Sequence, residues 1–202
     1  MSEPSTVPAA AAATMPPARR LAARDIALVA VFAGVTAALG FVPPFYLPIS
    51  PTPITAQTLG VMLAGAVLGW RLGFLSQLLL QTLVIIGLPL LSGGRGGLAV
   101  LANVTVGFFL AFSLAALLIG WATERVNREP YLWWKGVIIH VLFGLLFVYV
   151  LGVIGMMIVA ELSLGKAIVA GVIPYLPGDA LKAVIAAFIA AGVHKAYPGL
   201  LK

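Results

Sequence analysis

This sequence has few charged residues and no cysteine. Only 9% of its 202 residues are charged, and just six are Asp or Glu. The absence of cysteine excludes a disulfide framework, a thiolate metal site and a cysteine nucleophile. A chain that is 62% hydrophobic, with a mean hydropathy of +1.12, would expose large apolar patches as a soluble domain. These properties predict an all-α integral membrane protein.

The apolar runs set the number of membrane spans. A bilayer core takes about 20 apolar residues per helix, so the chain has room for about six transmembrane helices and no soluble domain. Prolines between residues 43 and 53 and glycines between 93 and 97 interrupt the runs. The predicted helices are 25–42, 54–70, 72–88, 98–122, 136–159 and 177–197, with a short interfacial helix or re-entrant loop over 160–176. We expect residues 1–23 to form a disordered cytoplasmic tail and 24–202 to form one transmembrane domain.

The basic residues predict the orientation of these helices. With both termini in the cytoplasm, only Arg95 and Lys166 fall in outer loops, which agrees with the positive-inside rule. The inner segments then collect nine basic residues: Arg19, Arg20, Arg24, Arg71, Arg125, Arg128, Lys135, Lys195 and Lys202. This orientation brings the proline-rich stretch, the glycine-rich loop and the start of the last helix to the outer end.

Asp179 and Lys182 are the strongest candidates for a solute site. Ionisable residues inside a span are costly, and they commonly mark solute pathways. Their i, i+3 spacing puts both on one helix face. The alternative is a self-neutralising pair whose lysine extends toward the interface.

Arg95 and two polar side chains are expected near the same end. Arg95 is the only charged residue of the glycine-rich loop, and its planar guanidinium suits bidentate recognition of a carboxylate or carbonyl. Gln57 begins the second predicted helix, and Asn103 lies one turn into the fourth. Polar residues inside spans more often make interhelical hydrogen bonds than ligand contacts.

The first predicted helix carries small residues at four-residue spacing: Ala30, Gly34 and Ala38. Such a stripe lets another backbone approach closely, either within the bundle or from a partner subunit. The spacing alone favours neither.

Other chemistry has little support. The sequence contains no nucleotide-binding loop, no His-Glu metal motif and no nucleophile beside a base. The basic residues stand singly rather than in a patch for nucleic acid, and His140 and His194 are far apart. We therefore expect no enzyme activity, no metal, no cofactor and no nucleic-acid partner.

Four motifs resemble the BioY family, the biotin-binding S components of energy-coupling factor (ECF) transporters. They are Pro53–Gly60, Leu63–Gly69, Gly87-Leu88-Pro89 followed by GGRGG, and Pro177–Ala183. The resemblance implies a six-helix bundle in a bacterial or archaeal plasma membrane, with biotin as ligand. It also implies a transmembrane T component and two ATPase subunits as partners.

The resemblance implies roles for individual residues as well. Asp179 and Lys182 correspond to polar ligand contacts on the sixth helix, and Ala30 and Gly34 to the surface that docks on the T component. Independently of the resemblance, the fused rings of biotin need apolar walls, and aromatic residues near the outer end, such as Phe45, Tyr46 and Tyr175, would supply part of them. Residues 102–109 depart from the common family pattern, and Phe109 stands where some relatives carry Arg.

Two alternatives stay open at this point. One is an S component for another small vitamin or precursor, motivated by residues 102–109. The other is a membrane assembly subunit without a solute, for which the small-residue stripe would be purely an interface.

Overall fold

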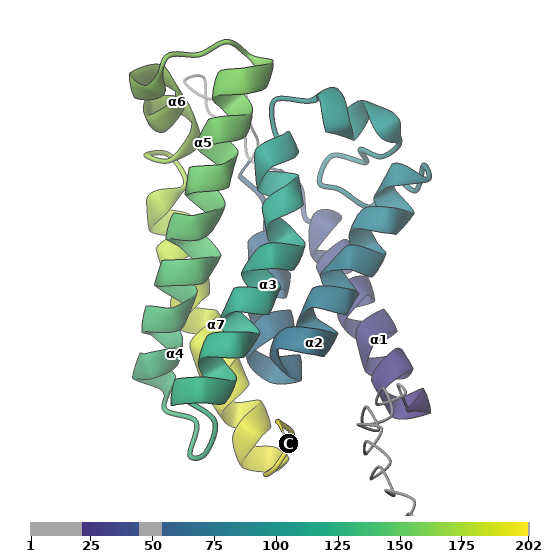
Figure 1. Ribbon diagram of the computed structural model, residues 1–202, viewed down its shortest axis with the longest axis vertical. Helices are drawn as coiled ribbons and strands as arrows, with labels where there is room; N and C mark the ends of the chain where they lie inside the picture. The colour runs from purple at the N-terminus through teal and green to yellow at the C-terminus, as the bar shows by residue number, and fades with distance from the viewer. Residues whose placement is uncertain (1–21, 45–53, 202) are drawn as a thin grey trace, which may run out of the picture.

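The protein is a bundle of helices that run along one long axis (Figure 1). A computed structural model describes residues 22–44 and 54–201. The main elements are α1 (Ala23–Gly40), α2 (Gln57–Ile85), the 3-10 helix η1 (Leu98–Ala102), α3 (Val106–Val126), α4 (Trp133–Ile139), the π-helix η2 (His140–Leu146), α5 (Phe147–Val159), α6 (Leu164–Gly171) and α7 (Leu176–Ala196).

Five helices of the described residues are long and apolar enough to cross a membrane, with α4, η2 and α5 forming one continuous helix over Trp133–Val159. α2 counts as two spans, because the chain reverses at Gly69. This glycine has φ 80°, a conformation that side chains with a Cβ rarely adopt. After the turn, a Cβ at Gly73 would lie 2.9 Å from the carbonyl oxygen of Ala64. The predicted helices 54–70 and 72–88 are thus confirmed as the two halves of α2.

The first half of α2 is the central helix of the bundle. Residues 57–68 span about 18 Å, less than a bilayer core. Nearly all of them are buried against other helices, so this half is shielded from lipid, where a short span would leave backbone groups unsatisfied. Met62 and Ile119, a pair in the main core cluster, have no exposed surface.

Some predicted boundaries were wrong for local reasons. The predicted helix over 98–122 begins only at Val106, because the Asn103 side chain accepts a hydrogen bond from the Thr105 amide (3.0 Å). The predicted helix over 136–159 begins earlier, at Trp133. There Nδ2 of Asn127 donates a hydrogen bond to the Leu132 carbonyl, and Oδ1 accepts one from the Leu132 amide. These two bonds fix the turn that precedes the helix.

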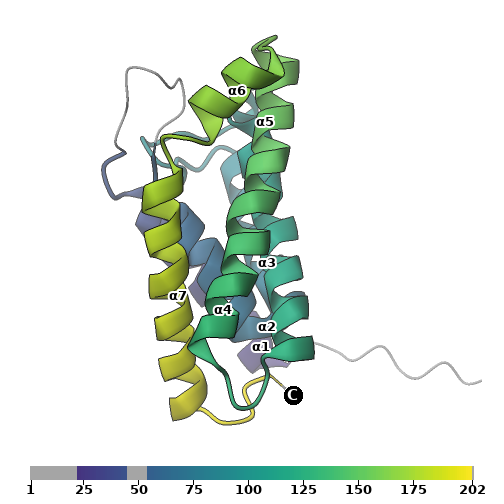
Figure 2. The same ribbon diagram turned by 90° about the vertical axis from the view of Figure 1, so that its left-hand side faces the viewer.

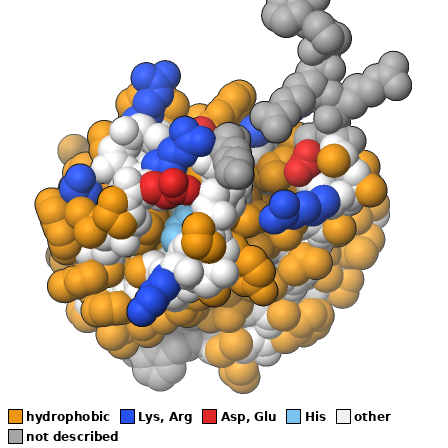
Figure 3. Space-filling model, turned by 90° about the horizontal axis from the view of Figure 1, so that it is seen from below, with side chains coloured by type: hydrophobic (Ala, Val, Ile, Leu, Met, Phe, Trp, Pro, Cys, Tyr) orange, Lys and Arg blue, Asp and Glu red, His pale blue; other side chains and the backbone are white. Residues whose placement is uncertain are grey.

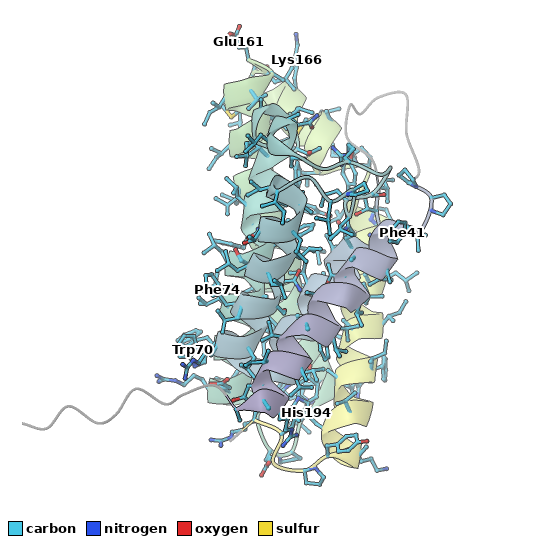
Figure 4. The ribbon with its side chains drawn as sticks, turned by 90° about the vertical axis from the view of Figure 1, so that its right-hand side faces the viewer. Phe41, Trp70, Phe74, Glu161, Lys166 and His194 are labelled. Carbon is cyan, nitrogen blue, oxygen red and sulfur yellow. The ribbon has the colours of Figure 1, made fainter. Side chains whose placement is uncertain are left out.

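The segment between α5 and α7 forms a short helix, α6, rather than a re-entrant loop. Figure 2 shows α6 across the end of the bundle between α5 and α7. Glu161 and Lys166 lie at this end, whereas Trp70 and His194 lie at the other (Figure 4). Most of the predicted tail and the predicted wall residues Phe45 and Tyr46 fall outside the described residues, and α1 begins at Ala23.

Candidate binding cavity at one end of the bundle

A cavity of about 630 Å³, counted out to its open mouth, lies at the end where α6 sits. Its size is within the range of small-molecule sites. Both aromatic and polar side chains line it: Thr55, Gln57, Thr58, Leu91, Arg95, Thr105, Phe108, Phe109, Phe112, Val148, Tyr149, Tyr175 and Asp179. The cavity thus brings the glycine-rich loop together with the start of α7, as predicted, and adds the start of α2. Most of the proline-rich stretch expected at the same end falls outside the described residues.

Asp179 is the acidic group of the cavity. It is in the first turn of α7 and only 6% exposed. Oδ2 accepts a hydrogen bond from the Tyr149 phenol (2.7 Å), and Oδ1 accepts one from the Thr58 hydroxyl (3.2 Å). Oδ1 also forms an ion pair with Nζ of Lys182 (2.7 Å). These donors, which come from α2, α5 and α7, hold the carboxylate in one orientation.

Lys182 stands behind Asp179 rather than on the cavity wall. Its ammonium also donates to the carbonyl oxygen of Thr55 (2.5 Å) and lies 3.4 Å from the Thr58 hydroxyl. Both of these contacts connect α7 to the residues at the start of α2. The i, i+3 pairing expected from the sequence is present, and the contact expected between Lys182 and a ligand stays a prediction.

Arg95 reaches the cavity from the glycine-rich loop. The loop turns back at Gly93 and Gly94, both with positive φ, and the Leu91 amide donates to the Arg95 carbonyl (3.1 Å). Nε of Arg95 donates to the Ser92 carbonyl (3.1 Å), and Nη1 donates to the Thr105 hydroxyl (3.1 Å). These bonds fix the guanidinium at the wall, and Nη2 takes part in neither of them.

Gln57 lines the cavity, but its amide group fastens the loop. Nε2 donates to the Leu90 carbonyl (3.1 Å) and the Thr36 carbonyl (3.3 Å), while Oε1 accepts from the Ser92 amide (3.0 Å). The side chain is 2% exposed. Gln57 therefore joins α1, α2 and the loop after α2, and its predicted ligand contact is untested.

Asn103 lies outside the lining and acts through Thr105. Its Oδ1 accepts from the hydroxyl of Thr105 (2.9 Å) as well as from the amide. Thr105 in turn accepts the hydrogen bond from Arg95. The geometry makes Asn103 a positioning residue for the arginine, and direct ligand binding by Asn103 stays a prediction.

Aromatic side chains form much of the remaining wall. Of the aromatic residues predicted for this role, Tyr175 is described, and it lines the cavity. Its ring centroid lies 6.5 Å from that of Phe108. Sequence reasoning missed Phe108, Phe112 and Tyr149. The aromatic spacing 108, 109 and 112 at the start of a span was an available signal, whereas Tyr149 has no signal in the sequence around it.

The small-residue stripe of α1 faces away from the bundle. Ala30, Gly34 and Ala38 are exposed, while Ala33 and Ala37 are buried. A Cβ at Gly34 would meet no atom within 4 Å. The stripe is consequently not used for packing within the described part of the chain.

Comparison with known proteins identifies relatives over most of the length. The BioY family profile matches residues 11–199. The chain is 42% identical over 185 residues to the biotin transporter BioY of Rhizobium etli, covering 88% of this chain and 97% of that protein. It is 41% identical over 172 residues to the probable biotin transporter BioY of Bacillus subtilis, covering 85% of this chain and 91% of that protein.

A solved structure has the same fold. It is the 2.1 Å crystal structure of the S-component for biotin from an ECF-type ABC transporter. The TM-score is 0.81 at 29% identity, and the match covers 85% of this chain and 91% of that chain. The similarity therefore extends beyond individual motifs to the arrangement of the helices.

Proposed function

This chain belongs to the BioY family, and from that premise we propose that it is the biotin-binding S component of an ECF-type vitamin importer. It is a multi-pass membrane protein. In this function it captures biotin from outside the cell, and separate subunits supply the energy for import. The proposal joins the family relationship to the chemistry of the cavity.

The observation that carries the proposal is one cavity that combines a fixed carboxylate, a fixed guanidinium and aromatic walls. Biotin needs all three, since its ureido ring offers donors and acceptors, its valerate carries a negative charge and its fused rings are apolar. A membrane assembly subunit without a solute would have no need for buried charged groups at the wall of a cavity. The cavity thus favours a solute-binding function.

We assign the polar contacts by their chemistry. The Asp179 carboxylate, held by Tyr149 and Thr58, is suited to accept the ureido N–H groups. Arg95 is the cation of the lining and is suited to the valerate carboxylate or the ureido carbonyl. Lys182 forms an ion pair with Asp179 and attaches it to the start of α2. Phe108 and Tyr175 would cover the apolar faces of the ligand.

Orientation and partners complete the proposed function. The excess of basic residues at the end opposite the cavity supports cytoplasmic termini and an outward-facing cavity. The exposed stripe at Ala30, Gly34 and Ala38 is the surface we assign to the transmembrane T component, since small residues permit close helix contact. Two ATPase subunits would hydrolyse ATP, because the sequence lacks a nucleotide-binding loop.

Equilibrium binding of biotin to the purified protein in detergent tests the proposal. We expect saturable binding of one biotin per chain by calorimetry, without added partners. A competition panel of other vitamins run beside it tests the substrate. If none of the other vitamins displaces biotin, the assignment of biotin as the substrate is supported. If another vitamin binds and biotin does not, that vitamin replaces biotin as the assigned substrate.

A further inference from the structure

A second cavity lies at the opposite end of the bundle, where α3 ends and α7 ends. It measures about 980 Å³ out to its mouth, and its lining includes Arg128, Glu129, Tyr131, Ala191, His194 and Lys195. Figure 3 views this end and shows Lys and Arg side chains near acidic and His side chains on the surface. Solute binding at the first cavity uses none of these residues.

Two cationic side chains of this second cavity are available to a ligand. Nε of Arg128 donates to the carbonyl oxygen of Leu201, which holds the side chain in place while neither Nη atom has an acceptor among the described residues. Lys195 makes no hydrogen bond or ion pair within the described ranges 22–44 and 54–201. Glu129 lines the same cavity but pairs with neither cation in that part of the chain. The cavity therefore has a net positive charge and attracts anions.

A rigid aromatic wall stands beside these cations. The rings of Tyr131 and His194 stack at 4.8 Å between centroids and 10° between planes. Nε2 of His194 lies 2.8 Å from the carbonyl oxygen of Ala66, which fixes the imidazole. Burial raises the pKa of the Tyr131 phenol, so this side chain adds no negative charge. The wall is therefore preorganised, and the two cations that share its cavity, Arg128 and Lys195, are exposed.

An apolar surface continues from the cavity along the side of the bundle. Phe188 is one turn of α7 away from the lining residue Ala191, and it stacks on Trp133 at 4.9 Å between centroids. Both side chains are about half exposed. Tryptophan rings at the end of a span favour the membrane interface. A ligand with an anionic head and an apolar tail would meet both surfaces at once.

We propose that this cavity binds the phosphate group of an anionic phospholipid, with Arg128 and Lys195 as its cationic contacts and the Trp133–Phe188 surface beneath its acyl chains. Basic pockets between transmembrane helices bind lipid head groups in this way. Inorganic phosphate offers the same anionic group, but it has no acyl chains to contact the apolar surface. A phospholipid is therefore the better candidate for the phosphate group bound here.

Native mass spectrometry of the detergent-solubilised protein tests this site with two probes, phosphatidylglycerol and phosphatidylcholine of the same acyl chains. We expect tighter retention of phosphatidylglycerol. Lys195→Gln should weaken it by roughly fivefold, the effect of one cation near an anionic lipid, and Lys195→Arg should restore it. Lys166→Gln, which removes an exposed lysine at the opposite end (Figure 4), is the matched control and should leave retention unchanged.

Three results of the lipid comparison would overturn the proposal, apart from the phosphate test below: equal retention of the two lipids, no effect of Lys195→Gln, or an equal effect of Lys166→Gln. Inorganic phosphate at millimolar concentration separates the two sources. Retention of phosphatidylglycerol in its presence supports the lipid, and complete displacement would assign the site to the free anion instead. Biotin binding by Lys195→Gln should equal that of the original protein, so failure here is distinguishable from failure of the proposed function.

Discussion

The phenol of Tyr149 donates a 2.7 Å hydrogen bond to Oδ2 of Asp179, 30 residues away on a different helix. Tyr149 is 5% exposed and Asp179 6% exposed, so water has little access to replace this bond. A hydrogen bond to a charged group contributes about 1.5–3 kcal/mol. The bond therefore both orients the carboxylate in the cavity and joins α5 to α7.

Tyr149→Phe removes that hydrogen bond and keeps the ring. We expect the free energy of unfolding to fall by about 1.5–3 kcal/mol, seen as a lower melting temperature in detergent. Tyr197→Phe is the matched control, since Tyr197 is 65% exposed and its hydroxyl has no partner among the described residues. Equal melting temperatures for the two variants would show that the Tyr149 bond contributes nothing to stability.

Asp179→Asn should weaken biotin binding more than Lys182→Gln does. The first variant removes the charge that faces the cavity, with an expected loss of roughly 10- to 100-fold in affinity. Lys182 is outside the lining and acts through Asp179 and Thr55. Calorimetric titration of both variants and of the double variant measures the ranking. Because Lys182 acts through the carboxylate, the double variant should lose less than the two single losses combined, and a fully additive loss would contradict this coupling.

The Asp179–Lys182 pair and the number of spans were predictable from the sequence, for different reasons. The i, i+3 spacing on a helix fixes proximity without tertiary information. Hydrophobic run length sets the spans because lipid demands satisfied backbone groups. Tyr149 and Thr58 were not identified as partners of Asp179, because their proximity depends on how α2 and α5 pack against α7. No local pattern encodes that packing.

The role of Gln57 was also beyond the sequence. Its position at the start of a helix near the cavity was correctly anticipated, but a Gln amide can serve a ligand or the backbone equally well. The structure commits it to Thr36, Leu90 and Ser92. The direction of the amide group follows from the fold of the loop after α2, which has glycines at the turn.

Gln57→Leu should loosen that loop. The change leaves the buried Ser92 amide and the partly buried Leu90 carbonyl without their side-chain partner, and an unsatisfied buried group costs about 1–3 kcal/mol. We expect the Ser92 amide to exchange with deuterium faster by at least about tenfold. Gln81→Leu is the control, because Gln81 is also buried but donates to the Phe109 carbonyl on α3. Unchanged exchange at Ser92 in Gln57→Leu would contradict the anchoring role.

Gly69→Ala should destabilise the reversal in α2. The φ of 80° is strained for alanine, and the added Cβ would collide with the Glu124 carboxylate, whose Oε1 accepts a hydrogen bond from the Trp70 amide (3.1 Å). A loss of about 1–3 kcal/mol in unfolding free energy is expected. Gly178→Ala, where a Cβ would meet no atom within 4 Å and φ is ordinary for a side chain, should show no such loss. A stable Gly69→Ala variant would mean that the turn adapts.

Gly34→Leu tests the surface assigned to the T component. Gly34 is exposed at the centre of the small-residue stripe on α1, so a larger side chain fits the isolated protein but blocks a closely packed partner helix. We therefore expect biotin binding to be retained and co-purification with the T component and ATPase subunits to be lost. Gly192→Leu adds the same bulk to an exposed, uncrowded position on α7 and should assemble normally.

Since both variants add an apolar side chain to a lipid-facing helix, any general effect of leucine on expression or solubility is shared, and only a difference between them reports on the stripe. Equal assembly of the two would remove the stripe from the interface.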